Sequence, residues 1–173
     1  DRFDVVVGNP PYIRYDDLPS DVATSYRTTW QTMRGRGDIF VGFFERSLGM
    51  LSPEGRVGFI CADRWMRNQY GAPLRAFVTE GFAVDHVWSM HDVDAFEAQV
   101  SAYPAITVMS RRRQGTVVVA ETTAEFGPTA ANSLLKWAQH GASMDFSSKV
   151  VAAHRLPHWF SGPEMWPTGS PAR

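Results

Sequence analysis

The feature that most constrains this chain is a short apolar segment that stops at two prolines. The segment from Phe3 to Val7 is mostly β-branched and is closed by Gly8-Asn9-Pro10-Pro11. Such a run is typical of a strand buried on both faces, as in a parallel sheet. Ligands of open α/β sheets bind beyond the carboxyl ends of strands, so Asn9-Pro10-Pro11-Tyr12 lies where a site is expected.

Strands and helices alternate along the rest of the chain. Asp38 to Leu51 has helical spacing of apolar residues, with Asp38 as N-cap and Ser52-Pro53-Glu54-Gly55 as the stop. Ile13 to Gly37 is polar and predicts a long loop with at most one helical turn, and loops of this length are usually functional. We further expect strands at 56–62, 83–90, 105–110 and 116–120, and helices at 71–80 and 130–139. This order predicts an α/β fold.

Composition limits the class of protein. The chain has 173 residues, 44% hydrophobic and 20% charged, which is typical of one globular domain. The net charge of −1 excludes a strongly basic nucleic-acid coat protein but leaves room for a local basic patch. Cys61 is the sole cysteine, so an intramolecular disulfide is impossible and a reducing, cytoplasmic location is expected. The apolar runs are too short to span a bilayer, so no membrane partner is expected.

The tetrapeptide carries an unusual set of groups. Asn9 offers an amide, and Pro10 is followed by another proline, which nearly fixes the direction of its carbonyl. Tyr12 adds an aromatic face. Two fixed acceptors beside an aromatic ring suit an exocyclic amino group on a planar base that stacks on Tyr12. A bare turn would need neither the asparagine nor the tyrosine.

The sequence resembles the gamma-class adenine DNA methyltransferases of restriction-modification and phage-defence systems. The match runs through residues 3–13, then Asp38-Ile39-Phe40-Val41-Gly42-Phe43-Phe44-Glu45, then Leu51-Ser52-Pro53-Glu54-Gly55-Arg56-Val57-Gly58-Phe59-Ile60. It resumes at Trp65-Met66, at Ala95-Phe96 and at Ala105-Ile106-Thr107-Val108. The resemblance implies a Rossmann-like class I fold that uses S-adenosylmethionine, here represented by the later strands of the sheet and their helices.

The resemblance also implies roles for particular residues. Asn9, Pro10, Pro11 and Tyr12 would be catalytic, acting on the N6 amino group of a flipped adenine. Phe96 would stack on the second face of that base, and Asn9, Asp38 and Phe43 would contact the cofactor. The alternative for Phe43 and Phe96 is an ordinary place in the hydrophobic core.

Double-stranded DNA is the expected partner, and arginines are placed to meet it. They follow the tetrapeptide and the strand at 56–62, where phosphate contacts would be useful: Arg27, Arg34, Arg36, Arg64 and Arg67. A solvated loop would explain them equally well. No metal site is expected, because the His154 and His158 pair has Pro157 within it and no matching cysteine pair.

The family's glycine-rich turn and acidic cofactor residue are absent before Asn9. We therefore expect residues 1–112 to be the C-terminal part of a catalytic domain whose cofactor-binding half lies elsewhere in the parent chain. Residues 113–158 would add a strand and a helix leading toward a target-recognition region, and 159–173 would be a linker-like end. We expect the chain alone to be inactive.

Two alternatives stay open at this point. Methyltransferases that modify a protein glutamine amide or a guanine amino group of ribosomal RNA share Asn-Pro-Pro-Tyr. A non-catalytic DNA-binding fragment is the alternative outside the enzymes. Methylation of cytosine carbon is disfavoured, since it needs a cysteine nucleophile and Cys61 lies inside an apolar strand.

Overall fold

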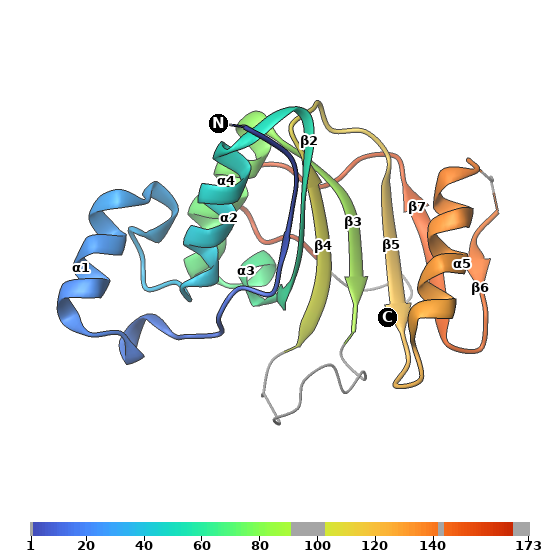
Figure 1. Ribbon diagram of the computed structural model, residues 1–173, viewed down its shortest axis with the longest axis horizontal. Coiled ribbons are helices and arrows are strands. Elements are labelled where there is room, and N and C mark those ends of the chain that lie inside the picture. Colours follow the sequence, from blue (N-terminus) through green and yellow to red (C-terminus); the bar gives the residue numbers. More distant parts are fainter. Residues whose placement is uncertain (1, 91–102, 142–143, 168–173) are drawn as a thin grey trace.

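A computed structural model describes residues 2–90, 103–141 and 144–167, which form one twisted sheet with helices on both faces (Figure 1). The sheet order within these residues is β1-β2-β4-β3-β5-β7-β6. The strands are β1 (Phe3–Gly8), β2 (Leu51–Ala62), β3 (Ala83–Ser89), β4 (Pro104–Ser110), β5 (Val117–Thr122), β6 (Phe146–Ser147) and β7 (Val151–Leu156). The helices are α1 (Ser20–Thr29), α2 (Phe40–Gly49), α3 (Arg64–Arg67), α4 (Ala72–Gly81) and α5 (Pro128–Gln139).

The strand directions define two ends of the sheet. β1 pairs with β2 in parallel, and β3 pairs with β5 in parallel. β4 lies antiparallel between β2 and β3, so β1, β2, β3 and β5 all run the same way. Their carboxyl ends share one edge of the sheet, the lower edge in Figure 1. The predicted α/β fold is confirmed.

Each face of the sheet packs against its own helices. Phe40, Phe44 and Leu48 recur at helical spacing on α2 and are fully buried with the β2 side chains beneath them. On the other face, Leu134 of α5 packs with Trp88 of β3. Because successive side chains of a strand point to opposite faces, the sheet separates the two apolar clusters. No helix among the described residues is long and apolar enough to cross a membrane.

The predicted long loop contains the 10-residue helix α1, where the sequence indicated no more than one helical turn. α1 exposes most of its side chains and buries only Ala23, so it lacks a strong apolar stripe. The segment after it is fixed instead by Glu45 of α2, whose carboxylate accepts hydrogen bonds from the Gln31 and Thr32 amides at 3.2 and 2.8 Å. A Cβ on Gly42 would come within 3.4 Å of the Trp30 ring, so the loop lies directly on α2.

Two predicted boundaries between residues 38 and 55 are wrong. The Asp38 side chain does not cap α2, which begins at Phe40 with Ile39 in the cap position. Ser52-Pro53-Glu54-Gly55 is not a stop between helix and strand, because β2 begins at Leu51 and passes through it. Glu54 has φ of 63°, and the β1–β2 register shifts beside it. β2 therefore continues through residues 52–55 with a local irregularity instead of a turn.

The C-terminal segment is packed rather than loose. Trp159 and Trp166 are buried in the cluster under α4, with their rings 6.1 Å apart and nearly perpendicular. Arg75 of α4 is also buried and donates to the Pro163 carbonyl at 2.7 and 3.0 Å. The expectation of a poorly packed end is wrong for this part of residues 159–173. The proposed domain boundaries stay a prediction.

β1 lies at an edge of the sheet and is more exposed than its sequence suggested. Val5 and Val7 have exposed fractions of 64% and 75%, and Phe3 is exposed as well. The parallel pairing is confirmed, whereas burial on both faces is wrong for this chain. Strand β1 instead presents an apolar edge, because only its β2 side carries a ladder among the described strands.

Candidate functional site

The tetrapeptide follows the carboxyl end of β1, and its side chains differ in how far they are buried. Pro10 is buried, while Asn9 and Pro11 are exposed. β1 pairs with β2 up to Gly8, opposite Phe59. The backbone is therefore fixed up to the residue before Asn9, and the Asn9 amide reaches solvent. This arrangement suits a group that must meet a ligand brought in from outside.

Tyr12 is half-buried at the edge of the main apolar cluster. Its ring centroid lies 6.4 Å from that of Phe40, the first residue of α2, at an interplanar angle of 52°. Burial raises the pKa of the Tyr12 hydroxyl above its usual range, with a smaller contribution from Cys61. The ring is thus held against α2 and its hydroxyl stays neutral, so Tyr12 can offer a stacking surface without bringing a charge.

The start of α2 is tied to the segment that follows the tetrapeptide. The Ile39 amide donates to the Ile13 carbonyl at 3.0 Å. Beside it, Oδ2 of Asp38 accepts a hydrogen bond from the Tyr70 hydroxyl at 3.2 Å. Burial raises the pKa of Asp38, while the Tyr70 hydrogen bond and the charges of Arg64 and Arg14 oppose that rise. A half-buried carboxylate therefore stands next to the tetrapeptide.

Tyr70 is the site residue that the sequence analysis missed. Burial and the neighbouring Asp38 raise the pKa of its hydroxyl, so it acts as a hydrogen-bond donor. Nothing in the spacing of residues 65–72 indicated that its partner would lie 32 positions earlier. An added Cβ on Gly37 would lie 3.1 Å from the Tyr70 ring, a close approach that only the structure reveals.

The two phenylalanines predicted at the site differ in what the structure says of them. Phe43 points outward from α2 with 37% of its surface exposed, unlike the buried Phe40 and Phe44. It is therefore not an ordinary core residue in this chain. Phe96, predicted to stack on the base, lies outside the described residues. The cofactor role of Phe43 and the stacking role of Phe96 stay predictions.

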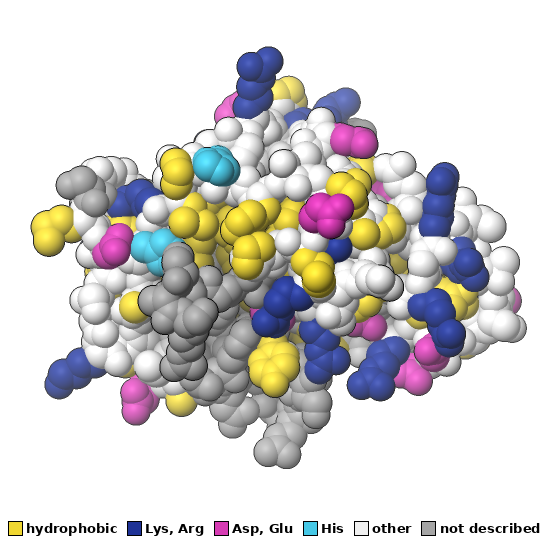
Figure 2. Space-filling view, turned by 180° about the vertical axis from the view of Figure 1, so that it is seen from behind, with side chains coloured by type: hydrophobic (Ala, Val, Ile, Leu, Met, Phe, Trp, Pro, Cys, Tyr) yellow, Lys and Arg dark blue, Asp and Glu magenta, His cyan; other side chains and the backbone are white. Residues whose placement is uncertain are grey.

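The arginines of the predicted DNA interface fall into two groups. Arg34 is exposed, and its backbone carbonyl accepts a hydrogen bond from Nη2 of Arg27 at 3.2 Å. The Arg27 guanidinium also lies 5.8 Å from the Tyr15 ring centroid. Arg36 forms an exposed ion pair with Asp16. Figure 2 shows Lys and Arg side chains gathered over the part of the molecule that carries α1, at the right of that view, with a few Asp and Glu among them.

The other two predicted DNA contacts come from α3. Nη2 of Arg67 donates to both carboxylate oxygens of Asp63 at 2.7 and 2.8 Å, and Asp63 is almost fully buried. Arg64, in the same short helix, is half-buried and adds its charge near Asp38. Arg67 thus already has a structural role. The DNA-binding role of all five arginines stays a prediction.

Comparisons with known proteins give the family and the fold of this chain. Residues 1–96, which carry β1, the tetrapeptide, α2 and the Asp38–Tyr70 contact, match the Eco57I restriction-modification methylase family. The chain belongs to this family. The tetrapeptide therefore lies within the part of the chain that matches the Eco57I restriction-modification methylases. The general resemblance noted in the sequence is confirmed at that level.

Curated relatives of this family member are much longer. A Type II methyltransferase, M.PaeR7I of Pseudomonas aeruginosa, is 50% identical over 119 residues, covering 69% of this chain and 21% of that protein. M.BstVI of Geobacillus stearothermophilus, also a Type II methyltransferase, is 35% identical over 166 residues, covering 95% of this chain and 30% of that protein. The chain therefore spans between about a fifth and a third of these relatives.

Solved structures support the fold. A Listeria monocytogenes protein assigned to the class I S-adenosylmethionine-dependent methyltransferases superposes with a TM-score of 0.60, at 16% identity. The match covers 80% of this chain and 42% of that one. The Eco57I-type chain thus has a Rossmann-like sheet of the class I methyltransferases, as expected from its sequence.

Proposed function

We propose that this chain is part of a DNA methyltransferase that transfers a methyl group from S-adenosylmethionine to the N6 amino group of a flipped adenine. The observation that carries the proposal is Asn9-Pro10-Pro11-Tyr12 at the carboxyl end of β1, within the residues that match the family. M.PaeR7I and M.BstVI are named as Type II methyltransferases, which supports a DNA substrate.

The residues near the tetrapeptide fit the cofactor. S-adenosylmethionine carries an amino acid group, a ribose and an adenine, and when bound it supplies an electrophilic methyl group. Asp38 offers a half-buried carboxylate as a hydrogen-bond acceptor just before α2, and Phe43 offers an exposed ring on α2. Asp38 and Phe43 would hold polar and planar parts of such a molecule, and Asn9 would complete the contact.

The base-side chemistry follows from the tetrapeptide. The adenine amino nitrogen is a poor nucleophile because its lone pair is delocalised into the ring. The Asn9 side-chain oxygen and the Pro10 carbonyl would accept the two amino hydrogens and localise that lone pair. They would also stabilise the positive charge that builds on nitrogen. The methylated nitrogen then loses one proton to solvent.

Two features of the structure favour amino methylation over carbon methylation. Cys61 is buried in β2, and burial raises the pKa of its thiol well above the ordinary value, so it is no nucleophile. The half-buried ring of Tyr12 offers a face on which an extruded base could stack. A flipped base held by stacking and by two acceptors needs no covalent bond to the enzyme.

The experiment is product identification with the whole polypeptide to which these residues belong. It is incubated with duplex DNA and labelled S-adenosylmethionine, and the DNA is then digested to nucleosides and analysed by mass spectrometry. We expect N6-methyldeoxyadenosine, lost in Asn9→Ala with DNA binding retained. Asn132→Ala, on the exposed surface of α5, is the matched control and should keep full activity. Methylcytosine as the product, or full turnover by Asn9→Ala, would contradict the proposal.

A further inference from the structure

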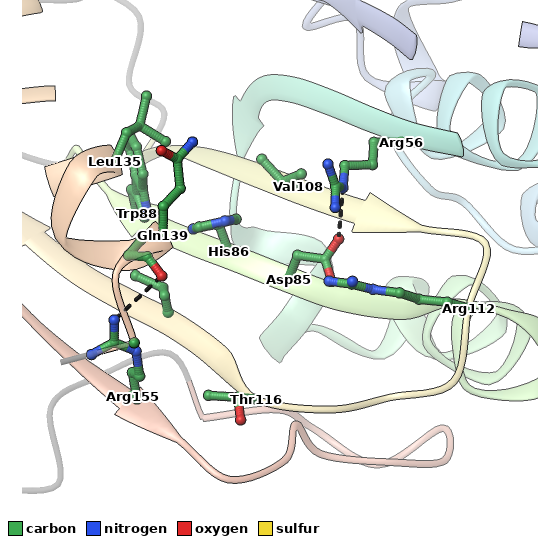
Figure 3. A pocket seen from close by; sticks show the side chains of 13 residues that line it. Arg56, Asp85, His86, Trp88, Val108, Arg112, Thr116, Leu135, Gln139 and Arg155 are labelled. Atoms are coloured by element: carbon green, nitrogen blue, oxygen red, sulfur yellow. Dashed lines mark hydrogen bonds and ion pairs between the residues drawn. The ribbon is translucent and has the colours of Figure 1, made fainter. Parts of the chain in front are cut away.

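A cavity of about 650 Å³ lies between α5 and the sheet, on the face opposite α2 and α4 (Figure 3). Its lining includes Asp85, near the amino end of β3, and Thr116, which directly precedes β5. The tetrapeptide follows the carboxyl end of β1, and β1, β3 and β5 run in the same direction. The cavity is therefore at the other end of the sheet from the proposed methyl-transfer site.

A β-bulge brings two titratable side chains into this cavity. Val84 pairs with Met109 and His86 pairs with Val108, so Asp85 is an extra residue in β3. In a regular strand, Asp85 and His86 would point to opposite faces. Here both line the cavity, as Figure 3 shows. Bulges commonly re-aim side chains in this way beside functional sites.

Two arginines share the single carboxylate of Asp85. Nε and Nη2 of Arg112 donate to Oδ1 at 3.2 and 2.6 Å. Nε of Arg56 lies 3.9 Å from Oδ2, beyond hydrogen-bond distance, and 57% of the Arg56 side chain is exposed. Asp85 itself is only 5% exposed. One acid thus faces two guanidiniums, which leaves an excess of positive charge.

Two polar side chains at the floor of the cavity have ring nitrogens without a hydrogen-bond partner among the described residues. Nδ1 of His86 and Nε1 of Trp88 are buried and make no hydrogen bond among the described residues. Their rings stand nearly perpendicular, with centroids 5.6 Å apart. Buried polar groups are normally hydrogen-bonded, so both atoms are candidates for contact with a ligand. Val108 and Leu135 give the cavity apolar walls.

We propose that this cavity binds an organic anion, with Arg56 and Arg112 holding its phosphate or carboxylate and the Trp88 floor and apolar walls holding its body. Arginine suits such a group because its planar fork matches two oxygens. The volume is within the range of small-molecule pockets. Arg155 also lines the cavity, but its guanidinium donates to the Trp137 and Ala138 carbonyls at the end of α5. It therefore caps the C-terminal end of that helix, and we assign it no role in holding the anion.

A bound anion would change the titration of His86. Burial lowers the pKa of His86, and Arg56 and Arg112 lower it further, while Asp85 raises it. A second negative charge beside the ring favours the imidazolium, so the pKa rises on binding. Binding near pH 6 should therefore be accompanied by proton uptake.

The test is calorimetric titration of the whole polypeptide with phenyl phosphate, and with benzoate, which stays ionised near pH 6, in two buffers of different ionisation enthalpy. We expect saturable one-to-one binding of both, with proton uptake measured with benzoate, because phenyl phosphate itself titrates in this range. Arg56→Gln should weaken it about tenfold, the loss of one charge-assisted hydrogen bond. The matched control is Arg113→Gln, an exposed neighbour outside the cavity lining, which should bind as the wild type does. His86→Gln should bind with its proton uptake abolished.

Further probes separate the two parts of the ligand. Benzoate should bind, inorganic phosphate should bind more weakly, and benzyl alcohol, which has the body without the charge, should not bind. Absence of saturation with both phenyl phosphate and benzoate would overturn the proposal. Equal losses in Arg56→Gln and Arg113→Gln would also overturn it, as would displacement of phenyl phosphate by stoichiometric duplex DNA. None of these outcomes depends on methyl transfer.

Discussion

The hydroxyl of Tyr70 donates to Oδ2 of Asp38 across 3.2 Å and so joins the start of α2 to the segment that leads into α4. The contact is closely packed, because an added Cβ on Gly37 would lie 3.1 Å from the Tyr70 ring. It positions a carboxylate that burial would otherwise push toward its neutral form. Tyr70 is therefore a positioning residue for the proposed cofactor site.

Tyr70→Phe should move the acid limb of S-adenosylmethionine binding to higher pH. Burial raises the pKa of Asp38, and the Tyr70 hydrogen bond lowers it, so its removal raises that pKa further. The ionised form accepts hydrogen bonds, and in the variant it is lost at a higher pH as the pH falls. The dissociation constant is measured from about pH 5 to pH 8. Tyr26→Phe, which keeps this contact, should show the wild-type profile; identical profiles for all three proteins would contradict the role.

Tyr12→Ala should weaken capture of an extruded adenine by about 1–3 kcal/mol, the usual range for base–aromatic stacking. Tyr12→Phe should be mild, because the ring face is kept. Affinity for duplexes with a mismatch at the target base measures the effect. Since Tyr12 packs near Phe40, unfolding of each variant is measured beside it. If phenylalanine were as damaging as alanine, the hydroxyl rather than the ring would be the working group.

Substitutions of Arg34 and Arg67 should have different effects, the first on DNA binding and the second on the stability of the fold. Arg34 is exposed in the segment after α1, so Arg34→Gln should reduce the salt dependence of DNA binding by about one phosphate contact and leave thermal unfolding unchanged. Arg67→Gln removes two hydrogen bonds from the buried Asp63 and should cost about 1–3 kcal/mol of stability. Salt titrations and thermal melts distinguish them, and a stable Arg67→Gln would contradict this account of α3.

The sequence predicted strands β1 and β2 and helix α2 because their signals are local. The apolar runs at 3–7 and 56–62 and the helical spacing of Phe40, Phe44 and Leu48 each indicate an element without knowledge of its neighbours. The burial of these three side chains in the structure agrees with that pattern. Asn9-Pro10-Pro11-Tyr12 was recognised for the same reason, since its residue types are unusual together.

The missed features depend on distant partners. Helix α1 has a weak apolar pattern, and the segment after it is anchored by Glu45, which no spacing within residues 13–37 could show. Trp159 and Trp166 lie among prolines and glycines that suggested a linker, yet both are buried under α4. Tyr70 meets Asp38 only because α2 and α4 pack on the same face of the sheet.

Gly71→Ala should be strongly destabilising. An added Cβ would lie 1.8 Å from the Trp65 carbonyl oxygen, a backbone atom that cannot move aside cheaply. The expected cost is about 3 kcal/mol, at the upper end of overpacking in a well-filled site. Gly81→Ala, at the last residue of α4, meets nothing within 4 Å and should change stability little. Denaturant unfolding of the two variants gives the comparison, and equal midpoints would contradict the close approach.

Val7→Lys should make the 173-residue chain more resistant to aggregation. Val7 is 75% exposed on β1, whose outer edge pairs with no other strand among the described residues and lies beside an apolar surface. A lysine there opposes pairing between chains by charge repulsion and leaves the ladder to β2 intact. Light scattering at increasing concentration measures the effect. Arg113→Lys, at an exposed position away from this edge, is the control. Unchanged aggregation in Val7→Lys would show that another surface drives association.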